Sequence, residues 1–432
     1  MNRPLKIAVA GLGTVGAGLL RLLSDNGGLV ERRCGRPVVV SAVSARDHGR
    51  DRGVDTGAAQ WFDDAVAMAR EADADVVVEL IGGSDGIARS VCETAIAAGR
   101  HVVTANKALL AHHGTALAVA AEAANVTIGY EAAVAGGIPV VKALREGLAG
   151  NRVGSLYGIL NGTCNYILTQ MRETGREFDD VLAEAQRLGY AEADPGFDVD
   201  GIDAAHKLSI LTSVAFGCEV NFAEVHVEGI RHVSAQDIRF ADELGYRIKL
   251  LAIARLTGYG LEQRVHPCMV ALDSPIAHVD GVFNAIVAQG DFVGSTVYEG
   301  RGAGAGPTAS AVAADIVDIA RGTRIPTFAV PAAALQRLPT APMDRHVGAY
   351  YIRLMVVDRP GVFADVAAAL RDAKVSMEAI LQRTRSPGEP VPVVMTTHDA
   401  RESAMREALR RIQALDTVTE TPAVIRIEPL AR

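Results

Sequence analysis

The chain has 432 residues, with 43 Lys plus Arg against 51 Asp plus Glu, so its formal net charge is −8. This length suggests two or three domains, and the acidic balance argues against a nucleic-acid-binding protein. Hydrophobic residues make up 49% and charged residues 22%, which is typical of a soluble globular protein, and no apolar run reaches the 18 residues of a membrane span.

The cysteines and the N-terminal segment indicate the compartment. Five cysteines lie far apart, without a C-x-x-C pair, which argues against a disulfide framework or a Cys-rich zinc site. The segment MNRPLKIAVAGLG lacks the apolar core and cleavage site of a signal peptide. We therefore expect a cytoplasmic protein that contacts neither membrane nor nucleic acid.

Residues 1–128 alternate short apolar runs with helical stretches. Strands are predicted at Leu5–Ala10, Pro37–Val43, Asp75–Ile81 and His101–Thr104, and helices at Thr14–Leu23 and Arg89–Ala98. Strand, helix and strand at this spacing indicate βαβ units and a parallel sheet. The prediction is an α/β fold whose first domain, residues 1–128, is a Rossmann-type dinucleotide-binding domain completed by a helix near 309–321.

Residues 129–336 lack a regular βα rhythm, and we expect an α+β substrate-binding and dimerisation domain with a helix from Asp203 to about Phe216. Two prolines in Arg337–Arg345 indicate a linker, placed at 337–348. Residues 349–432 then read βαββαβ, the order of a small ferredoxin-like domain. Its elements are predicted at Tyr350–Val357, Val362–Ala373, Val375–Gln382, Val391–Thr397, Arg401–Leu415 and Ala423–Ile427.

A G-x-G-x-x-G motif, Gly11-Leu12-Gly13-Thr14-Val15-Gly16, follows the first predicted strand and opens the first helix. Gly11 permits a tight turn, Gly13 lets the backbone approach a pyrophosphate, and Gly16 lets the helix pack on the strand. The helix N-terminus supplies unpaired N–H groups, among them those of Thr14 and Val15, for the phosphates. The motif in this context predicts binding of a dinucleotide.

The end of the second strand bears on which dinucleotide is bound. An NAD enzyme usually carries an acid there, which bonds the ribose 2′-hydroxyl. Here the strand ends in Ser44-Ala45-Arg46-Asp47. Arg46 suits the 2′-phosphate of NADP(H), which is the preferred cofactor on this reading, while Asp47 keeps NAD(H) open.

An acid-rich loop is the most informative stretch of the central region. Glu192, Asp194, Asp198, Asp200 and Asp203 fall within twelve residues. Acids this close repel one another unless a cation lies among them. That cation could be a lysine, a metal ion or the ammonium group of an amino-acid substrate.

Asp203 and Lys207 are four residues apart, so on a helix they share a face. Asp203 also stands where the helix should begin and could be its N-cap. One interpretation of the pair is an ordinary surface ion pair. The other is that Asp203 orients Lys207 as a catalytic acid at the mouth of a substrate pocket.

The loop resembles the signature of the homoserine dehydrogenases. Its fixed positions are filled without a departure by Ala185, Gly189, Tyr190, Ala191, Asp194, Pro195, Asp198, Val199, Gly201, Asp203 and Lys207. The resemblance extends over nearly the whole chain, including the glycine loop, Thr104–Lys107, Glu131–Pro139, Asn161–Thr163 and Gly302–Gly304. The resemblance favours the catalytic interpretation of Asp203 and Lys207.

The resemblance implies reduction of L-aspartate 4-semialdehyde to L-homoserine with NADPH or NADH, a step of threonine, methionine and isoleucine biosynthesis. By this resemblance Lys207 is the proton donor to the aldehyde oxygen, and Asp203 holds Lys207 and the substrate hydroxyl. Glu192 and Asp198 are expected to receive the substrate ammonium. Lys107, after the strand His101–Thr104, is expected near nicotinamide and substrate, where it could hold the carboxylate or assist Lys207.

The resemblance also implies two further ligand contacts. Gly304 is expected to approach the cofactor. The segment Glu131–Pro139 resembles the family's monovalent cation loop, with sodium held by Glu131 and the backbone carbonyls of Val134, Gly136 and Ile138. A loop that merely packs the domain hinge is the alternative.

The C-terminal βαββαβ unit resembles an ACT domain, the amino-acid sensor of many biosynthetic enzymes. Its turn Asp358-Arg359-Pro360-Gly361 leads into a helix N-terminus, which suits a carboxylate. We expect threonine to bind there at a subunit interface and to inhibit the enzyme. Pairing of such units implies a homodimer or homotetramer, and a purely dimerising role is the alternative.

Three other interpretations remain as alternatives to this function. Cys164 could be the nucleophile of a phosphorylating semialdehyde dehydrogenase, but no base is identifiable beside it in the sequence. The chain could be another amino-acid-aldehyde oxidoreductase of related fold, since fold does not fix substrate. It could also be a non-enzymatic amino-acid sensor. The eleven histidines show no metal-binding spacing.

Overall fold

The structure is a computed structural model, and it describes residues 3–383 and 386–430. The chain divides into two compact units, which are described separately. Unit 1 contains residues 1–162, 203–225 and 282–338, and unit 2 contains residues 163–202, 226–281 and 339–432. No helix among the described residues is long and apolar enough to span a membrane.

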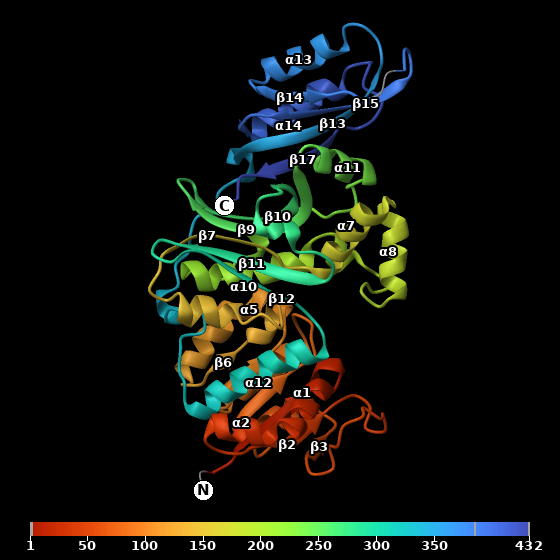
Figure 1. The fold of residues 1–432 in the computed structure, drawn as a ribbon. Helices are drawn as coiled ribbons and strands as arrows, with labels where there is room; N and C mark the ends of the chain where they lie inside the picture. The colour runs from red at the N-terminus through yellow and green to blue at the C-terminus, as the bar shows by residue number, and fades with distance from the viewer. Residues whose placement is uncertain (1–2, 384–385, 431–432) are drawn as a thin grey trace. The chain divides into compact units, whose positions relative to one another are not determined.

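Unit 1 contains a six-stranded parallel sheet in the order β3-β2-β1-β4-β5-β6, the strand order of a dinucleotide-binding fold (Figure 1). Its strands are β1 (Leu5–Ala10), β2 (Val38–Ser44), β3 (Gln60–Phe62), β4 (Val76–Glu79), β5 (His101–Thr104) and β6 (Ile128–Gly129). Four of these strands, β1, β2, β4 and β5, were predicted, because the central ones are short apolar runs buried on both faces, whereas the short β3 and β6 were not predicted. The Rossmann-type fold is confirmed.

Helices flank this sheet. They are α1 (Thr14–Asp25), α2 (Gly27–Cys34), α3 (Ala65–Glu71), α4 (Ile87–Ala97), α5 (Lys107–Ala123) and, from much later in the chain, α12 (Ala305–Arg321). Helix α12 packs on α1, where Leu19 meets Val312 and Ile316 in one buried cluster with the strands (Figure 1). The approach is close, since a Cβ on Gly18 would lie 2.9 Å from the carbonyl oxygen of Ala305. Helix α12 therefore belongs to the core of the dinucleotide-binding part.

The rest of unit 1 carries the elements from which the candidate site is built. Strand β11 (Phe283–Gly290) pairs antiparallel with both β7 (Val153–Ile159) and β12 (Gly294–Arg301). Helix α10 (Ile202–Phe216) is buried almost throughout its length. The short α6 (Val140–Lys142) continues into one π-helical turn at Ala143–Gly147.

Unit 2 contains a continuous run of strands in the order β9-β10-β17-β13-β15-β14. These strands are β9 (Tyr246–Thr257), β10 (Gly260–Ala271), β13 (Val347–Val357), β14 (Met377–Leu381), β15 (Pro390–Thr397) and β17 (Ala423–Glu428). Two-residue strands β8 (His226–Val227) and β16 (Ala400–Arg401) pair with β10 and β13. The helices are α7 (Gly162–Thr174), α8 (Phe178–Arg187), α9 (Gly196–Val199), α11 (Ala235–Glu243), α13 (Val362–Asp372) and α14 (Glu402–Gln413).

The C-terminal part of unit 2 has the predicted βαββαβ order. Helices α13 and α14 pack together, and Val366, Leu370 and Met405 share a buried cluster with residues of β13 and β15 (Figure 1). The ferredoxin-like arrangement is confirmed. What the sequence pattern did not show is that its strand β17 also pairs with β10 of the central region.

Candidate active site

The glycine loop has the geometry that a pyrophosphate site needs. Gly11 has φ +100°, and a Cβ there would lie 2.6 Å from the carbonyl oxygen of Leu80. A Cβ on Gly16 would lie 2.1 Å from the carbonyl oxygen of Gly11, so the turn and the helix require glycine at both positions. Around Gly13 a Cβ would meet nothing within 4 Å, and no side chain caps α1 there. The first N–H groups of α1, including those of Thr14 and Val15, therefore suit the phosphates of a dinucleotide.

The end of β2 places Arg46 at the surface beside this loop. Ser44 is buried, and its carbonyl accepts a hydrogen bond from the Gly11 N–H. The Asp47 carboxylate accepts from the N–H of Gly49 at 2.9 Å, so this acid is engaged with its own turn. Arg46 is exposed, and a guanidinium is a group that can pair with a phosphate.

Three charged residues predicted from the sequence meet at Asp203. Its Oδ2 accepts a hydrogen bond from Lys207 Nζ at 2.7 Å, and its Oδ1 lies 3.0 Å from Lys107 Nζ. The Lys207 ammonium also donates to the carbonyl oxygen of Leu160 at 2.8 Å, and Asn161 Nδ2 donates to Asp203 Oδ2 at 2.8 Å. The structure thus brings together a carboxylate and two ammonium groups from α10 and α5.

Burial strengthens the attraction between the Asp203 carboxylate and the two ammonium groups, because little water screens their charges. Asp203 is 3% and Lys207 8% exposed, whereas the Lys107 side chain is 35% exposed. Burial alone would raise the pKa of Asp203, but the ammonium groups of Lys207 and Lys107 hold that pKa well below its usual range. Asp203 is therefore an anion throughout the neutral pH range.

The prediction that Asp203 is the N-cap of its helix is wrong. Helix α10 begins at Ile202, so Asp203 is its second residue. Its carboxylate is directed to Lys207, Lys107 and Asn161 rather than to the start of the helix. The i,i+4 spacing from Asp203 to Lys207 is kept, as predicted.

A hydrogen-bonded brace that the sequence did not reveal holds the start of α5. The buried Glu79 accepts from Thr104 Oγ1 at 2.6 Å, and Thr104 Oγ1 accepts from the N–H of Asn106 at 2.9 Å. Asn106 caps α5, with its Oδ1 accepting from the N–H of Leu109. This brace fixes the position from which Lys107, the first residue of α5, reaches Asp203. Glu79 ends a strand, which is the one local signal it offers.

The predicted cation loop is buried in unit 1. Glu131 is 2% exposed, and its two carboxylate oxygens accept from the N–H groups of Val141 and Lys142, each at 2.9 Å. Burial and the nearby Asp315 raise the pKa of Glu131 to about 7. The predicted carbonyl ligands Val134, Gly136 and Ile138 follow in buried backbone. Oxygen atoms of this kind suit a hard cation.

The acid loop lies in unit 2, and several of its carboxylates already bond other residues of that unit. Asp194 accepts from the N–H of Gly196, and Asp200 pairs with Arg231 at 2.5 Å. Thr163 Oγ1 lies 3.4 Å from Asp198 Oδ2. Glu192 is exposed. The substrate-binding roles of Glu192 and Asp198 stay predictions.

Cys164 is fully buried, and its Sγ lies 3.2 Å from the carbonyl oxygen of Asp198. A nucleophilic thiol needs access to substrate and a nearby base. Its burial argues against the alternative of a thioester-forming enzyme.

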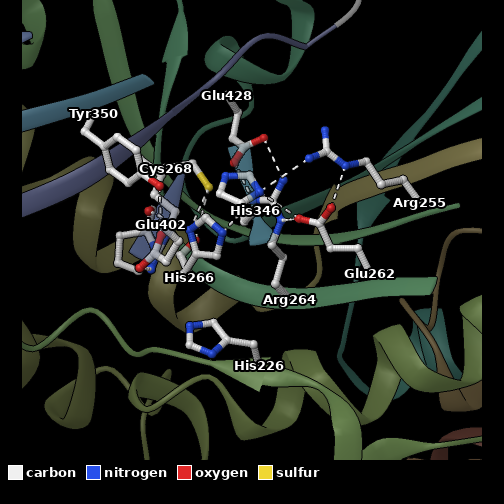
Figure 2. Close-up of polar contacts among 12 residues, drawn as sticks. His226, Arg255, Glu262, Arg264, His266, Cys268, His346, Tyr350, Glu402 and Glu428 are labelled. Atoms are coloured by element: carbon white, nitrogen blue, oxygen red, sulfur yellow. Dashed lines mark hydrogen bonds and ion pairs between the residues drawn. The ribbon is translucent and has the colours of Figure 1, made fainter. Parts of the chain in front are cut away.

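One group of side chains among the described residues has the spacing of a metal site. Ligand atoms of His266, Cys268 and Glu428 lie within 4.8 Å of one another, all buried (Figure 2). Arg264 fills the space: its Nη1 lies 2.7 Å from His266 Nε2 and also bonds Glu428. A fully buried guanidinium in that position repels a cation, so we interpret the group as part of an ionic network.

That network joins β10 to the C-terminal elements within unit 2 (Figure 2). Arg264 Nε donates to Glu262 at 2.5 Å, and Glu262 in turn bonds His346 and Arg255. Burial and the Arg264 guanidinium lower the pKa of His266 to about 3, so its imidazole is neutral. A second set surrounds Arg426, which bonds the carboxylates of Glu402 and Glu228.

Comparisons with known proteins relate nearly the whole chain to one family. Family models match for homoserine dehydrogenase at residues 139–317, its NAD-binding domain at residues 11–131, and the ACT domain at residues 350–416. A homoserine dehydrogenase of Neisseria gonorrhoeae is 47% identical over 434 residues, covering 99% of both chains.

Solved structures agree in fold. A homoserine dehydrogenase from Thiobacillus denitrificans has 46% sequence identity and a TM-score of 0.92, covering 99% of this chain and 98% of that one. A hyperthermophilic archaeal homoserine dehydrogenase in complex with NADPH has 28% identity and a TM-score of 0.62, covering 73% of this chain and 97% of that one.

Proposed function

The chain belongs to the homoserine dehydrogenase family, and we propose that Lys207, Asp203 and Lys107 carry out its chemistry. It is an oxidoreductase that reduces L-aspartate 4-semialdehyde to L-homoserine with a nicotinamide cofactor. The observation that carries the assignment of residues is the contact of Asp203 with both lysines in unit 1.

We assign proton donation to Lys207. The cofactor supplies a hydride to the aldehyde carbon, which leaves negative charge on the aldehyde oxygen. An ammonium group held beside that oxygen both stabilises the charge and protonates it. Lys207 is anchored by Asp203 and by the carbonyl oxygen of Leu160, so its ammonium has a fixed position. Asp203 is the positioning anion for both lysines.

The other polar residues suit a zwitterionic substrate. The Lys107 side chain is one-third exposed while it contacts Asp203, so it can hold the substrate carboxylate. Glu192 and Asp198 are anions of the acid loop, and we assign the substrate ammonium to them.

Turnover by the purified chain tests the function directly. With NADPH and L-aspartate 4-semialdehyde we expect NADPH absorbance to fall and homoserine to accumulate in equal amounts. A panel of other amino-acid aldehydes is the control, because the alternative of a related oxidoreductase predicts that one of them is preferred. Lack of turnover with every aldehyde would contradict the proposed function and favour the alternative of a non-enzymatic amino-acid sensor.

We propose that NADP(H) is preferred over NAD(H). Exchange of Arg46 for alanine should raise KM for NADPH roughly 10- to 100-fold, because charge-assisted hydrogen bonds to the 2′-phosphate contribute about 1.5–3 kcal/mol. KM for NADH, which lacks that phosphate, should stay within about twofold and serves as the matched control. Equal changes with both cofactors would show that Arg46 does not contact the phosphate.

We also propose that threonine binds at the turn Asp358–Gly361. Gly361 has φ +97° and directly precedes α13, and the Asp358 carboxylate accepts from the N–H of Ser386 at 2.8 Å. The turn thus leads into the N-terminus of an eleven-residue helix, a place that suits a carboxylate.

Substitution of Gly361 tests this placement. Gly361→Val strains the left-handed backbone and covers the first N–H groups of α13, so threonine inhibition should be lost while basal kcat is unchanged. Asp372→Ala, at the other end of α13, is the control and should keep the inhibition. Inhibition that survives Gly361→Val would place the effector elsewhere. Deletion of the whole C-terminal part is a poorer test, because it also removes Glu428. The buried Arg264 would then lose its ion-pair partner.

Further proposals concern the ion, the assembly and the compartment. Sodium is proposed at Glu131 with the carbonyls of Val134, Gly136 and Ile138. A homodimer or homotetramer is supported by the end strand β12, whose hairpin exposes Phe292, Val293 and Val297 by 90%, 46% and 47%. The five cysteines are all buried, as suits a protein of the reducing cytoplasm.

A further inference from the structure

Asn284, near the start of β11, has a buried side-chain amide that forms no hydrogen bond with the described residues. It is 1% exposed, and neither its Nδ2 nor its Oδ1 has a hydrogen-bond partner among the described residues. A primary amide offers two donors and an acceptor with two lone pairs, and buried polar groups of this kind are almost always satisfied in native proteins. Asn284 therefore calls for a partner that arrives from outside the chain.

The position of Asn284 relates it to the catalytic lysine. Ala285, the next residue, pairs with Ile159 of β7, so Asn284 is level with Leu160. The carbonyl oxygen of Leu160 accepts the hydrogen bond of Lys207. The amide thus lies on the strand next to the loop that supports Lys207.

Two glycines bring backbone close to the same amide. A Cβ on Gly162 would lie 3.4 Å from Asn284 Oδ1, and a Cβ on Gly302 would lie 2.3 Å from Asn284 Cγ. Gly302 opens the glycine segment 302–304 that precedes α12, and Gly304 there has φ +118°. Glycine is required at 302 because Asn284 occupies the space of a side chain.

We propose that Asn284 binds the carboxamide of the nicotinamide ring, an inference that rests on the proposed function. A carboxamide carries one donor group and one acceptor, so it can satisfy Asn284 Nδ2 and Oδ1 together. A substrate carboxylate accepts only, and would leave Asn284 Oδ1 unpaired and facing an anion. The unspent donor and acceptor on one side chain therefore favour the cofactor over the substrate.

This contact would set the geometry of hydride transfer. The carboxamide is attached to C3 of the ring, next to C4, which carries the hydride. A carboxamide held by Asn284 would place the nicotinamide ring on the side of the site where Leu160 anchors Lys207. Gly302 brings only backbone toward the amide, so no side chain of residue 302 stands between Asn284 and the cofactor.

The test uses two reduced cofactors and the full chain. One is NADPH, and the other is reduced 3-acetylpyridine adenine dinucleotide phosphate, in which a methyl ketone replaces the carboxamide and removes its donor. Binding is followed by the fluorescence of the reduced ring, without substrate. Wild type should bind NADPH roughly 10-fold more tightly than the analogue. In Asn284→Ala this preference should fall to about twofold or less, with NADPH binding weakened about 10-fold.

Gln289→Ala is the matched control. Gln289 lies on the same strand and also carries a primary amide, but it is five residues from Asn284. Its exchange should change neither the affinity for NADPH nor the preference over the analogue.

Two outcomes would overturn the inference. The first is a wild-type protein that binds both cofactors equally, a result that needs no variant to fold. The second is an Asn284→Ala protein that weakens both cofactors by the same factor, which would indicate a structural role. In either case, turnover of NADPH by the wild-type protein shows which hypothesis has failed. If the wild type is active, only the inference about Asn284 is contradicted. If it is inactive, the proposed function is contradicted as well.

Discussion

Lys207→Ala should lower kcat by about two to four decades with NADPH and aspartate semialdehyde, the scale on which general acid catalysis operates. The exchange removes the group assigned to protonate the aldehyde oxygen. It should not unfold unit 1, because Asp203 keeps its contacts with Lys107 and Asn161. Steady-state kinetics, with a melting curve for each variant, measures the effect.

Lys207→Arg separates the charge of this residue from its proton. Arginine keeps a cation beside Asp203, but its pKa is far higher than that of lysine, which makes it a poor acid. We expect wild-type stability with a kcat that stays at least tenfold below wild type. A near-normal kcat in Lys207→Ala would show that Lys207 only pairs with Asp203 and does not donate the proton. Lys107 would then be the acid to test.

Arg264→Leu should lower the stability of unit 2 by about 3–5 kcal/mol, the cost of removing one partner from a buried ion pair. The exchange leaves the buried carboxylates of Glu262 and Glu428 without their shared guanidinium. The pKa of Glu428, about 2 in the intact network, shows how strongly Arg264 favours the charged form there, against the effect of burial. Urea denaturation followed by circular dichroism measures the loss.

An exposed ion pair on α14 provides the control for this prediction. Arg410 pairs with Glu407 at 2.8 Å, but the Arg410 side chain is 71% exposed. Arg410→Ala should therefore change stability far less than Arg264→Leu does. The double variant Arg264→Leu with Glu428→Leu should lose less than Arg264→Leu alone, because it removes both charges. Equal effects of Arg264→Leu and Arg410→Ala would contradict the role of the network.

Much of the local structure could be predicted from the sequence, because it follows from short-range patterns. Strand β1 begins and ends as predicted, and α1 starts at the predicted Thr14. The contact between Asp203 and Lys207 follows from the i,i+4 spacing of a helix. In each case the deciding residues are neighbours in the sequence.

Contacts between distant segments could not be predicted in this way. Lys107 reaches Asp203 from α5, and Asn161 reaches it from a loop after β7. Neither approach leaves a periodic pattern in the sequence, and the family resemblance supplied the residues but not the distances. Sequence reasoning also gave Asp203 the wrong local role, because an acid near a helix start usually caps it.

The long strands of unit 2 show a second limit. Strand β10 is buried at ten consecutive residues, Leu261–Val270, and these include Glu262, Arg264 and His266. A strand buried on both faces lacks the period-2 alternation that identifies strands. Charged residues inside it look like a surface segment until their partners on other elements are known.

The pairing of β10 with β17 has a consequence for how the chain is made. Strand β10 ends at Ala271, and β17 begins only at Ala423, so during synthesis β10 waits for a neighbour that the ribosome has not yet produced. Until then the part of its edge at Cys268–Val270 has no neighbouring strand, and Arg264 lacks the carboxylate of Glu428. Open strand edges recruit other chains. Nascent and prematurely terminated chains are therefore the species most in need of chaperones, and the last strand to emerge closes the sheet against aggregation.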